Sequence, residues 1–394
     1  MLFPNSPVPG EDMRRFAQIV PARRKMIDEA PDTPLPVTYA VNELAKALHP
    51  GETDAEISDI INETADAKTF VLRPIGARAA FPYFRAGQFI TLTAQVGGSR
   101  LTRPYSLSSS PAEALAGRCS VTVRRSGVFS NWLYNEAHVG TRLQLGEPSG
   151  EFHHDSLRDS HSVVGIAGGC GVTPFLSMAK AIAEGSEDYD LTLLYGARRA
   201  CDVIGKRTLD ALAGPRVRIV YVFSEEAVEN AEHGFITAEL IQRYAPARSS
   251  FFLCGPDAMY SFVGRELHSL GIKDKFVRRE QNAVGRRAVA HPRVFFLKVR
   301  MRNQAYVISA REEETLLCAM ERAGLSAPSR CRSGSCGFCH SRLLSGKYTV
   351  PAENESRRLA DLKFGFLHPC CTYPDSDMEI DVPIDRPSTE KELK

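Results

Sequence analysis

No stretch of the sequence approaches the roughly 18 consecutive apolar residues that a membrane-spanning helix needs. An excess of charge of one sign is also missing, because 49 basic residues face 47 acidic ones and the formal net charge is +2. That balance gives no general reason to expect binding to nucleic acid or to a membrane surface. The first residues include Glu11 and Asp12 and have no apolar segment of the secretory kind. We therefore expect a cytoplasmic protein without a membrane span.

The cysteines are unevenly spread along the chain. There are ten of them, and five lie between residues 331 and 371. In a chain of 394 residues without a secretory signal, such a cluster favours metal binding or redox chemistry over disulfide bonds. The rest of the composition is ordinary for a folded protein, and the length indicates two or three domains.

The pattern of the chain changes along its length. Residues 1–52 are rich in Pro, Arg and Glu and contain one expected helix at 41–49. Short β-runs separated by turn residues fill residues 57–152, which is typical of a sandwich or barrel. From residue 162 onward strands alternate with helices, which indicates a parallel sheet. A basic linker near residues 284–293 leads to two strands, a helix and the cysteine cluster.

The run CRSGSCGFC, which begins at Cys331, is the most specific signal in the chain. Cys331, Cys336 and Cys339 have C-x4-C-x2-C spacing, and Cys370 follows 31 residues after the third of them. This is the ligand spacing of a plant-type 2Fe–2S cluster, in which four thiolates hold two irons. A zinc site of four cysteines is the alternative, although zinc sites usually show two short pairs. Either Cys370 or its neighbour Cys371 completes the set.

The cysteine region as a whole resembles a known type of domain. The run GLSAPSRCRSGSCGFCHSRLLSGK is similar to the ferredoxin domains fused to bacterial oxygenase reductases. This resemblance implies a β-grasp ferredoxin domain over residues 294–385, in which the three loop cysteines and Cys370 hold the cluster. The offset from Gly365 selects Cys370, and it leaves Cys371 without an assigned task.

Residues 103–106 read Arg-Pro-Tyr-Ser within a β-run. Four residues on a strand are by themselves often just a strand, but these resemble the R-x-Y-S flavin motif of the ferredoxin–NADP reductase family. The resemblance implies that Arg103 pairs with a flavin phosphate as a forked donor, that Tyr105 lays its ring on the isoalloxazine, and that Ser106 reaches the flavin N5. Pro104 completes the motif.

A second glycine motif, Gly-Val-Phe-Ser, follows at residues 127–130. In the same family a G-x-x-S turn opens a helix whose amides bind the pyrophosphate, which suits a helix N-terminus. The other interpretation is that Ser130 only caps a short helix at 131–134. The form GVFSNWL resembles the branch that binds FAD rather than FMN. The implied flavin-binding residues here are Val123, Gly127, Val128 and Ser130.

A glycine turn, Gly-Gly-Cys-Gly-Val-Thr-Pro at residues 168–174, follows a buried strand and opens a helix. Strand, turn and helix start together form a cradle for a pyrophosphate. The turn resembles the G-G-x-G-x-T-P motif of the same reductase family, and a turn without any ligand is the alternative. The implied nucleotide-binding residues are Gly169, Gly171, Thr173 and Pro174.

The run at residues 252–256, together with Met259, resembles the C-G-P motif of the family. The resemblance implies that Cys254 sits beside the nicotinamide C4 and orients hydride transfer without acting as a nucleophile, whereas a buried cysteine is otherwise inert. Glu280 is the candidate for an acidic residue that relatives place near the flavin, although no aromatic residue follows it. The implied catalytic residues are Ser106, Cys254 and Glu280, and the implied binding residues are Cys254, Gly255, Pro256 and Met259.

The choice between NADH and NADPH stays open. Arg198 and Arg199 follow a strand at a place where a ribose 2′-phosphate could lie, and Arg198 is the implied binding residue. Glu225, which follows Ser224, would repel that phosphate, and NADP-specific relatives often carry a basic residue there.

The resemblance covers about residues 53–385 and implies a multidomain chain of mixed α+β and α/β class. Its expected parts are an N-terminal helical extension (1–52), an antiparallel β-barrel FAD domain (53–157), a parallel-sheet α/β nucleotide domain (158–285), a linker (286–293), the ferredoxin domain (294–385) and a tail (386–394). The extension is expected to pack on the FAD domain, and a docking or dimerisation element is the alternative.

The implied activity is that of an NAD(P)H-dependent reductase. Electrons would pass from NAD(P)H to FAD, then to the 2Fe–2S cluster, and finally to a separate acceptor protein such as an oxygenase or hydroxylase component. The sequence shows no Rieske C-x-H pair and no obvious set of haem ligands, so the acceptor is expected on another protein. The alternatives are a reductase for an anaerobic demethylase or corrinoid protein, a non-catalytic redox sensor, and a flavin subunit within a larger complex.

Overall fold

The computed structural model describes residues 10–31, 38–48, 51–76, 81–280 and 283–383. The expected tail, 386–394, lies outside the described residues. The chain divides into two compact units, Met1–Lys46 and Ala47–Lys394. Helix α1 (Gly10–Asp28) belongs to the first unit, and α2 (Ala40–Leu48) appears where the sequence predicted a helix at 41–49. Within the described residues, no helix is both long enough and apolar enough to cross a bilayer.

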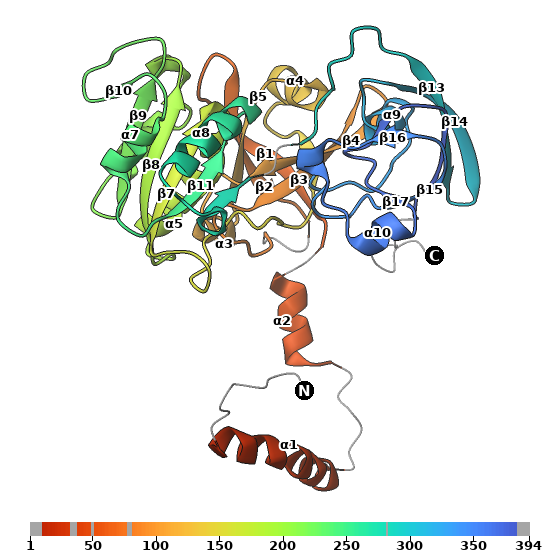
Figure 1. The fold of residues 1–394 in the computed structure, drawn as a ribbon, viewed down its shortest axis with the longest axis horizontal. Helices are drawn as coiled ribbons and strands as arrows, with labels where there is room; N and C mark the ends of the chain where they lie inside the picture. Colours follow the sequence, from red (N-terminus) through yellow and green to blue (C-terminus); the bar gives the residue numbers. More distant parts are fainter. Residues whose placement is uncertain (1–9, 32–37, 49–50, 77–80, 281–282, 384–394) are drawn as a thin grey trace. The chain divides into compact units, whose positions relative to one another are not determined.

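Six antiparallel strands form the sheet of the FAD domain, in the order β4–β3–β6–β1–β2–β5 (Figure 1). A further antiparallel bridge between Leu107 and Val121 joins the chain after β4 to β5, so the sheet curls into a half-barrel. Short helices α3 (Pro111–Leu115) and α4 (Val128–Asn135) lie in its connections. The strands are β1 (Thr53–Asn62), β2 (Ala67–Pro74), β3 (Phe89–Val96), β4 (Ser99–Ser106), β5 (Cys119–Arg124) and β6 (Arg142–Leu145).

Two local features of this domain differ from the sequence predictions. The first half of β1 was missed, because its outward side chains such as Asp54 are charged and only Ala55 and Ile57 are buried there. Helix α4 begins at residue 128 instead of 131, with Gly127 in the capping position. The interpretation of Ser130 as the N-cap was therefore wrong. Its hydroxyl oxygen instead accepts hydrogen bonds from the Ser126 and Gly127 amides, both at 2.9 Å.

The nucleotide domain is built on a parallel sheet in the order β10–β9–β8–β7–β11–β12. Alternating strand residues face opposite sides: Val163 packs with helix α5, whereas Val164 packs with α7 and α8. The strands are β7 (Ser162–Gly168), β8 (Asp190–Ala197), β9 (Val217–Phe223), β10 (Glu232–His233), β11 (Ser250–Cys254) and β12 (Val277–Arg279). The helices are α5 (Thr173–Ala183), α6 (Lys206–Leu212), α7 (Ala238–Tyr244) and α8 (Asp257–Ser269).

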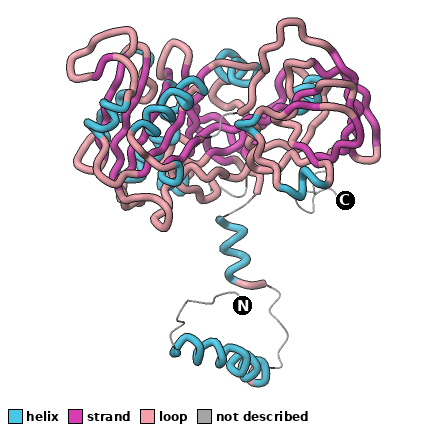
Figure 2. Tube along the Cα trace, in the orientation of Figure 1, coloured by secondary structure: helices cyan, strands magenta, loops and turns pink. Residues whose placement is uncertain are grey.

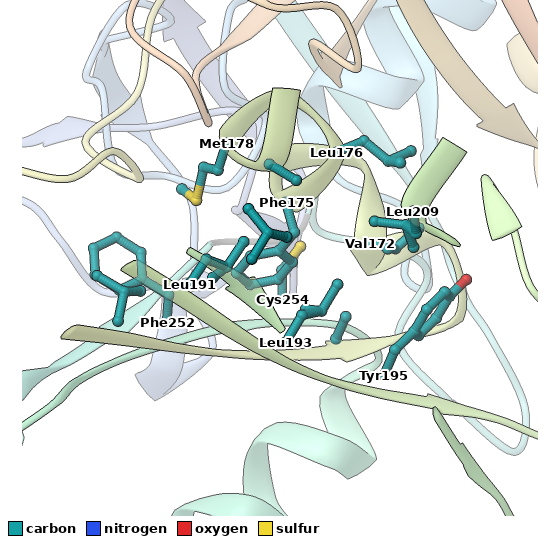
Figure 3. Close-up of a cluster of buried hydrophobic side chains, with 14 of the residues drawn as sticks. Val172, Phe175, Leu176, Met178, Leu191, Leu193, Tyr195, Leu209, Phe252 and Cys254 are labelled. Carbon is teal, nitrogen blue, oxygen red and sulfur yellow. The ribbon is translucent and has the colours of Figure 1, made fainter. Parts of the chain in front are cut away.

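The core under α5 fixes the turn that begins this helix. Figure 3 shows Phe175 and Met178 of α5 above Leu191 and Leu193 of β8, and all four side chains are fully buried. Tyr195, in the same cluster, donates its hydroxyl to the carbonyl of Gly169 at 2.9 Å. Apolar packing and this buried hydrogen bond therefore hold the glycine turn in one position.

The ferredoxin domain has a mixed sheet in the order β14–β13–β19–β15–β17, with β13 antiparallel to β14 and parallel to β19. Its core forms between this sheet and helix α9 (Leu316–Arg322). The cysteine loop that follows contains no helix or strand over residues 325–340 (Figure 2). The main strands are β13 (Val294–Met301), β14 (Gln304–Arg311), β15 (Ser341–Ser345), β17 (Phe366–Leu367) and β19 (Met378–Asp381). A two-stranded sheet of β16 (Tyr348–Thr349) and β18 (Tyr373–Pro374) and helix α10 (Leu359–Lys363) complete the domain.

Candidate functional site

The site begins where the strand order of the parallel sheet reverses. The chain runs from β7 to β8 and β9 on one side and later returns to β11 on the other side of β7. The turns after β7 and β11 diverge at such a point, and ligands of open α/β sheets bind in the crevice between them. Register pairs Cys254 with Ala167, so the turn starting at Gly168 and the turn starting at Gly255 lie side by side.

The two turns touch through their backbones. A Cβ atom on Gly171 would lie 2.0 Å from the carbonyl oxygen of Cys254, and one on Gly255 would lie 2.3 Å from the Met259 side chain. Glycine is required at both positions because no larger residue leaves room for the neighbouring turn. Glu280 follows β12 at the same edge, and its amide donates to the carbonyl of Leu253 at 3.0 Å.

A cavity of about 440 Å³ at this edge receives residues from all three predicted motif sets. The flavin motif, the glycine turn, the turn after β11 and the cysteine loop each contribute to its wall. The predicted site residues in the wall are Pro104, Tyr105, Ser106, Val123, Gly171, Thr173, Cys254, Gly255, Pro256, Glu280 and Cys331. Residues far apart in the sequence thus meet at one place.

Within this cavity the character of Cys254 is set by its surroundings. Its side chain is buried at the end of β11. Burial raises the pKa of the Cys254 thiol, and the Glu280 carboxylate raises it further, so the thiol stays neutral near pH 7. A neutral thiol can position a neighbouring group but is a poor nucleophile.

A second cavity, of about 550 Å³, continues from the first along the ends of β7, β8 and β9. Of the predicted residues, Gly169, Arg198, Pro256 and Met259 line it. Phe235 and Phe262 also line it, and no sequence motif marked them. The shape and position of this cavity suit the remainder of a dinucleotide.

Arg124 joins the two cavities and was missed by the sequence analysis. It ends β5, lines both cavities, and has Nη1 2.7 Å from where a Cβ atom on Gly169 would lie. Asp66 holds its Nε at 3.2 Å. A guanidinium at the mouth of a glycine turn is well placed for a phosphate. Its only sequence signal was its place at the end of the strand before the G-x-x-S turn.

Some predicted residues lie outside both cavities. The guanidinium of Arg103 contacts Glu321 of the ferredoxin domain, Nη1 to Oε1 at 2.9 Å. Arg103 Nη1 also donates to the carbonyl of Thr102, so these two contacts leave Nε and Nη2 for a phosphate. Gly127, Val128 and Ser130 form the start of α4, and Pro174 lies in the first turn of α5.

The cysteine loop folds around sulfur atoms. The amides of Ser333 and Cys336 each donate to Cys331 Sγ at 3.4 Å, and that of Phe338 donates to Cys336 Sγ at 3.5 Å. Such N–H···S bonds stabilise thiolates and are typical of iron–sulfur sites. Positive φ angles at Gly334 and Gly337, 90° and 68°, allow the tight path.

The four predicted cluster thiols form a series of pairwise contacts. Hydrogen bonds from the Cys336 and Cys370 thiols lower the pKa of Cys331, and contacts with Cys331 and Cys339 raise that of Cys370. Among the described residues, no three Cys, His, Asp or Glu side chains are grouped as ligands of a single metal ion. Pairwise contacts without one shared centre fit two irons with two thiolates each better than the single zinc ion of the alternative.

Cys371 has a packing task. Its Sγ lies 2.8 Å from where a Cβ atom on Gly334 would be, and its thiol faces the carbonyls of Asn354 and His368 at 3.8 and 3.5 Å. It therefore supports the cysteine loop from below, whereas Cys370 contacts the loop thiols.

Three family models match the chain in the order of its domains. The oxidoreductase FAD-binding domain matches residues 54–154, the oxidoreductase NAD-binding domain matches 166–265, and the 2Fe-2S iron-sulfur cluster binding domain matches 299–375. The reductase subunit of glycine betaine monooxygenase from Chromohalobacter salexigens is 28% identical over 84% of this chain and 95% of that protein.

The ferredoxin reductase component of 3-ketosteroid-9-alpha-monooxygenase from Mycobacterium tuberculosis is 31% identical over 82% of this chain and 94% of that protein. This chain belongs to the ferredoxin–NADP reductase family. Its three domains have the order of the oxygenase-reductase type. The solved structure of phthalate dioxygenase reductase shares the fold, with a TM-score of 0.62 at 23% identity over 85% of this chain and 98% of that one.

Membership of this family gives the protein its cofactors and activity. It is an NAD(P)H-dependent oxidoreductase with FAD and a 2Fe–2S cluster, and electrons pass from NAD(P)H through FAD to the cluster. The sequence predictions of family, fold class, enzyme class and cofactors are confirmed.

Replacing Gly171 by Ala should slow the reduction of FAD by NADH. The added methyl group forces the two turns apart, and a displacement of about 1 Å between reacting groups costs roughly 10- to 100-fold in rate. Stopped-flow bleaching of the flavin measures the effect. Gly264→Ala in α8 is the control, because the nearest atom to its Cβ is 3.5 Å away. Equal rates in Gly171→Ala and the wild type would contradict the assigned role of this contact.

The adjacent cysteines 370 and 371 offer a matched pair of variants. Cys370→Ala should lose most of its iron and its electron paramagnetic resonance signal, because the cluster then lacks one thiolate. Cys371→Ala should keep both, at a modest cost in stability from the lost packing. Iron analysis and spectra of the two purified variants decide the matter, and the reverse pattern would move the fourth ligand to Cys371.

Proposed function

We propose that this protein is the reductase component of an oxygenase or hydroxylase system, and that it delivers single electrons to a separate acceptor protein. The observation that carries the proposal is the placement of the cysteine loop. Cys331 lines the cavity that holds Tyr105 and Ser106, while Cys336 is exposed at the surface of the same loop. The loop therefore has one side toward the flavin residues and another toward a docking partner.

The relatives support the oxygenase as the kind of acceptor. Their names describe reductase components of glycine betaine monooxygenase, 3-ketosteroid-9-alpha-monooxygenase and 1,2-phenylacetyl-CoA epoxidase. The sequence itself shows no Rieske pair and no obvious haem ligand set, so oxygen activation is assigned to the partner. The proposal includes the cytoplasmic location and the domain limits expected from the sequence.

The residue assignments belong to the same proposal. FAD supplies hydride acceptance and one-electron donation, and the 2Fe–2S cluster supplies one-electron transfer. Tyr105 and Ser106 orient the flavin ring, and the neutral Cys254 with Glu280 aligns the nicotinamide against it. Gly169, Gly171 and Thr173 allow the pyrophosphate to approach the start of α5. The cluster is held by Cys331, Cys336, Cys339 and Cys370.

The charges near the adenosine end favour NADH. Arg199 is held by Glu225 at 3.0 Å, and Arg198 lies 3.8 Å from Asp202. Both arginines that could bind a 2′-phosphate therefore have carboxylate neighbours, and Asp202 itself lines the cavity with Arg198. A carboxylate there accepts a hydrogen bond from a ribose 2′-hydroxyl and repels a phosphate.

Anaerobic addition of NADH, followed by rapid freezing, tests the proposed function. We expect the flavin to bleach and the resonance signal of a reduced 2Fe–2S cluster to appear in the same sample. Cytochrome c, as a one-electron acceptor, should then be reduced in many turnovers, which a redox sensor would not support. Bleaching of the flavin without a cluster signal would contradict the path.

We expect kcat/KM for NADH to exceed that for NADPH by about tenfold or more, a difference of about 1.4 kcal/mol. Asp202→Asn should narrow the ratio, because it removes the negative charge from the cavity wall. Asp188→Asn is the matched control, since that exposed carboxylate precedes β8 at the opposite edge of the sheet. A preference for NADPH in the wild type would overturn this assignment.

A further inference from the structure

One carboxylate is shared by two arginines at the contact between the FAD and ferredoxin domains. Glu321, near the end of α9, accepts from Arg103 Nη1 at 2.9 Å and from Arg332 Nη1 at 2.8 Å through the same oxygen, Oε1. Its second oxygen accepts from Arg332 Nη2 at 3.2 Å. The side chains of Glu321 and Arg332 are only 7% and 5% exposed.

The two arginines belong to the two electron-carrying motifs. Arg103 lies on β4 in the flavin motif, two residues before Tyr105. Arg332 directly follows Cys331 in the cysteine loop, and its Nη2 also lies 3.4 Å from Cys318 Sγ. Helix α9 packs against β4, so Glu321 stands between the two motifs.

The backbone of the cysteine loop is shaped for this contact. Arg332 has φ of 58°, in the left-handed region that non-glycine residues seldom occupy. Its carbonyl accepts from the Val284 amide of the interdomain linker at 2.8 Å. A buried arginine in this conformation persists only where the surroundings fix it, and Glu321 provides the countercharge.

We propose that Glu321 is a positioning residue for electron transfer from FAD to the cluster, because it ties the flavin strand and the cysteine loop to one carboxylate. It touches neither substrate nor cofactor in this role. The inference rests on the electron path of the proposed function. Glu321 fixes the separation of the two motifs, whereas hydride transfer depends on the turns after β7 and β11, which Glu321 does not touch.

Buried ion pairs seldom add much net stability, but they define one arrangement against others. A shared carboxylate requires both guanidiniums at once, so a shifted ferredoxin domain would leave a buried charge without its partner. The other ion pair between these domains, Arg330 with Glu147 at 3.5 Å, is 30% and 40% exposed and is weaker for that reason.

The test compares Glu321→Gln with the wild type in the full-length holoprotein. After anaerobic mixing with NADH, flavin bleaching reports hydride transfer, and freeze-quenched resonance spectra report cluster reduction. We expect Glu321→Gln to bleach its flavin at the wild-type rate and to reduce its cluster about tenfold more slowly or worse, since a shift of about 1 Å is enough for such a loss. Dithionite should still reduce its cluster fully.

Two further variants keep the test decisive. Glu314→Gln is the matched control, because Glu314 is a buried carboxylate of the same domain whose partner, Arg322 at 2.6 Å, lies within that domain. It should transfer electrons at the wild-type rate. Glu321→Asp keeps the charge with a shorter reach, so it should recover part of the rate, and it replaces Glu321→Gln if that variant does not assemble its cluster.

Three results would overturn the inference. Cluster reduction at the wild-type rate in both Glu321 variants would exclude the role. An equal loss of flavin and cluster reduction would assign Glu321 a general structural role, as would an equal loss in Glu314→Gln. A wild-type protein whose cluster NADH does not reduce would instead contradict the proposed function, which separates that failure from the failure of Glu321.

Discussion

At the carboxyl edge of the parallel sheet, two backbone turns press together so closely that Gly171 has no space for a methyl group. Parallel pairing of β7 with β11 sets this contact, and the buried hydroxyl of Tyr195 holds the glycine turn from beneath. The other groups of the site are placed relative to it. Arg124 reaches the turn from the FAD domain, and Cys331 reaches the same cavity from the ferredoxin domain. A crevice fixed by backbone atoms keeps its shape whichever side chains surround it, so it can align two planar cofactor rings reproducibly.

The ferredoxin domain is attached by a different kind of interaction. Its link to the flavin strand is ionic and buried, since Glu321 serves Arg103 and Arg332 together. The desolvation cost of three charged groups offsets most of the attraction, so the gain is in the definition of one geometry and less in stability. Two guanidiniums and one carboxylate leave a net positive charge beside a set of thiolates, which favours the anionic state of the cluster ligands.

The sequence predicted what depends on local spacing and missed what depends on contacts across domains. The loop cysteines are recognisable because one tight turn supplies three ligands, and the glycine turns are recognisable because backbone approach excludes side chains. Arg124 and Glu321 gave no such signal, because each acts through residues far away in the chain: Gly169 for Arg124, and Arg103 for Glu321. The first half of β1 was missed for a related reason, since its partners on β2 and β6 bury only alternate residues and the rest carry charge. The task of Cys371 likewise required the position of Gly334.

The cysteine loop also explains how one short segment serves two environments. Cys331 and Cys339 are buried, whereas Cys336 and the neighbouring Phe338 are exposed, with Arg330 stacked 4.7 Å from the ring of Phe338. Five residues separate the thiol in the flavin cavity from the thiol at the surface, so the same loop that receives electrons also presents them. An acceptor needs only to cover the Phe338 side of the loop, because the opposite side is committed to the flavin domain through Arg332. Docking of a partner and docking of the two domains therefore use different faces of the loop, and neither has to be broken for the other to form.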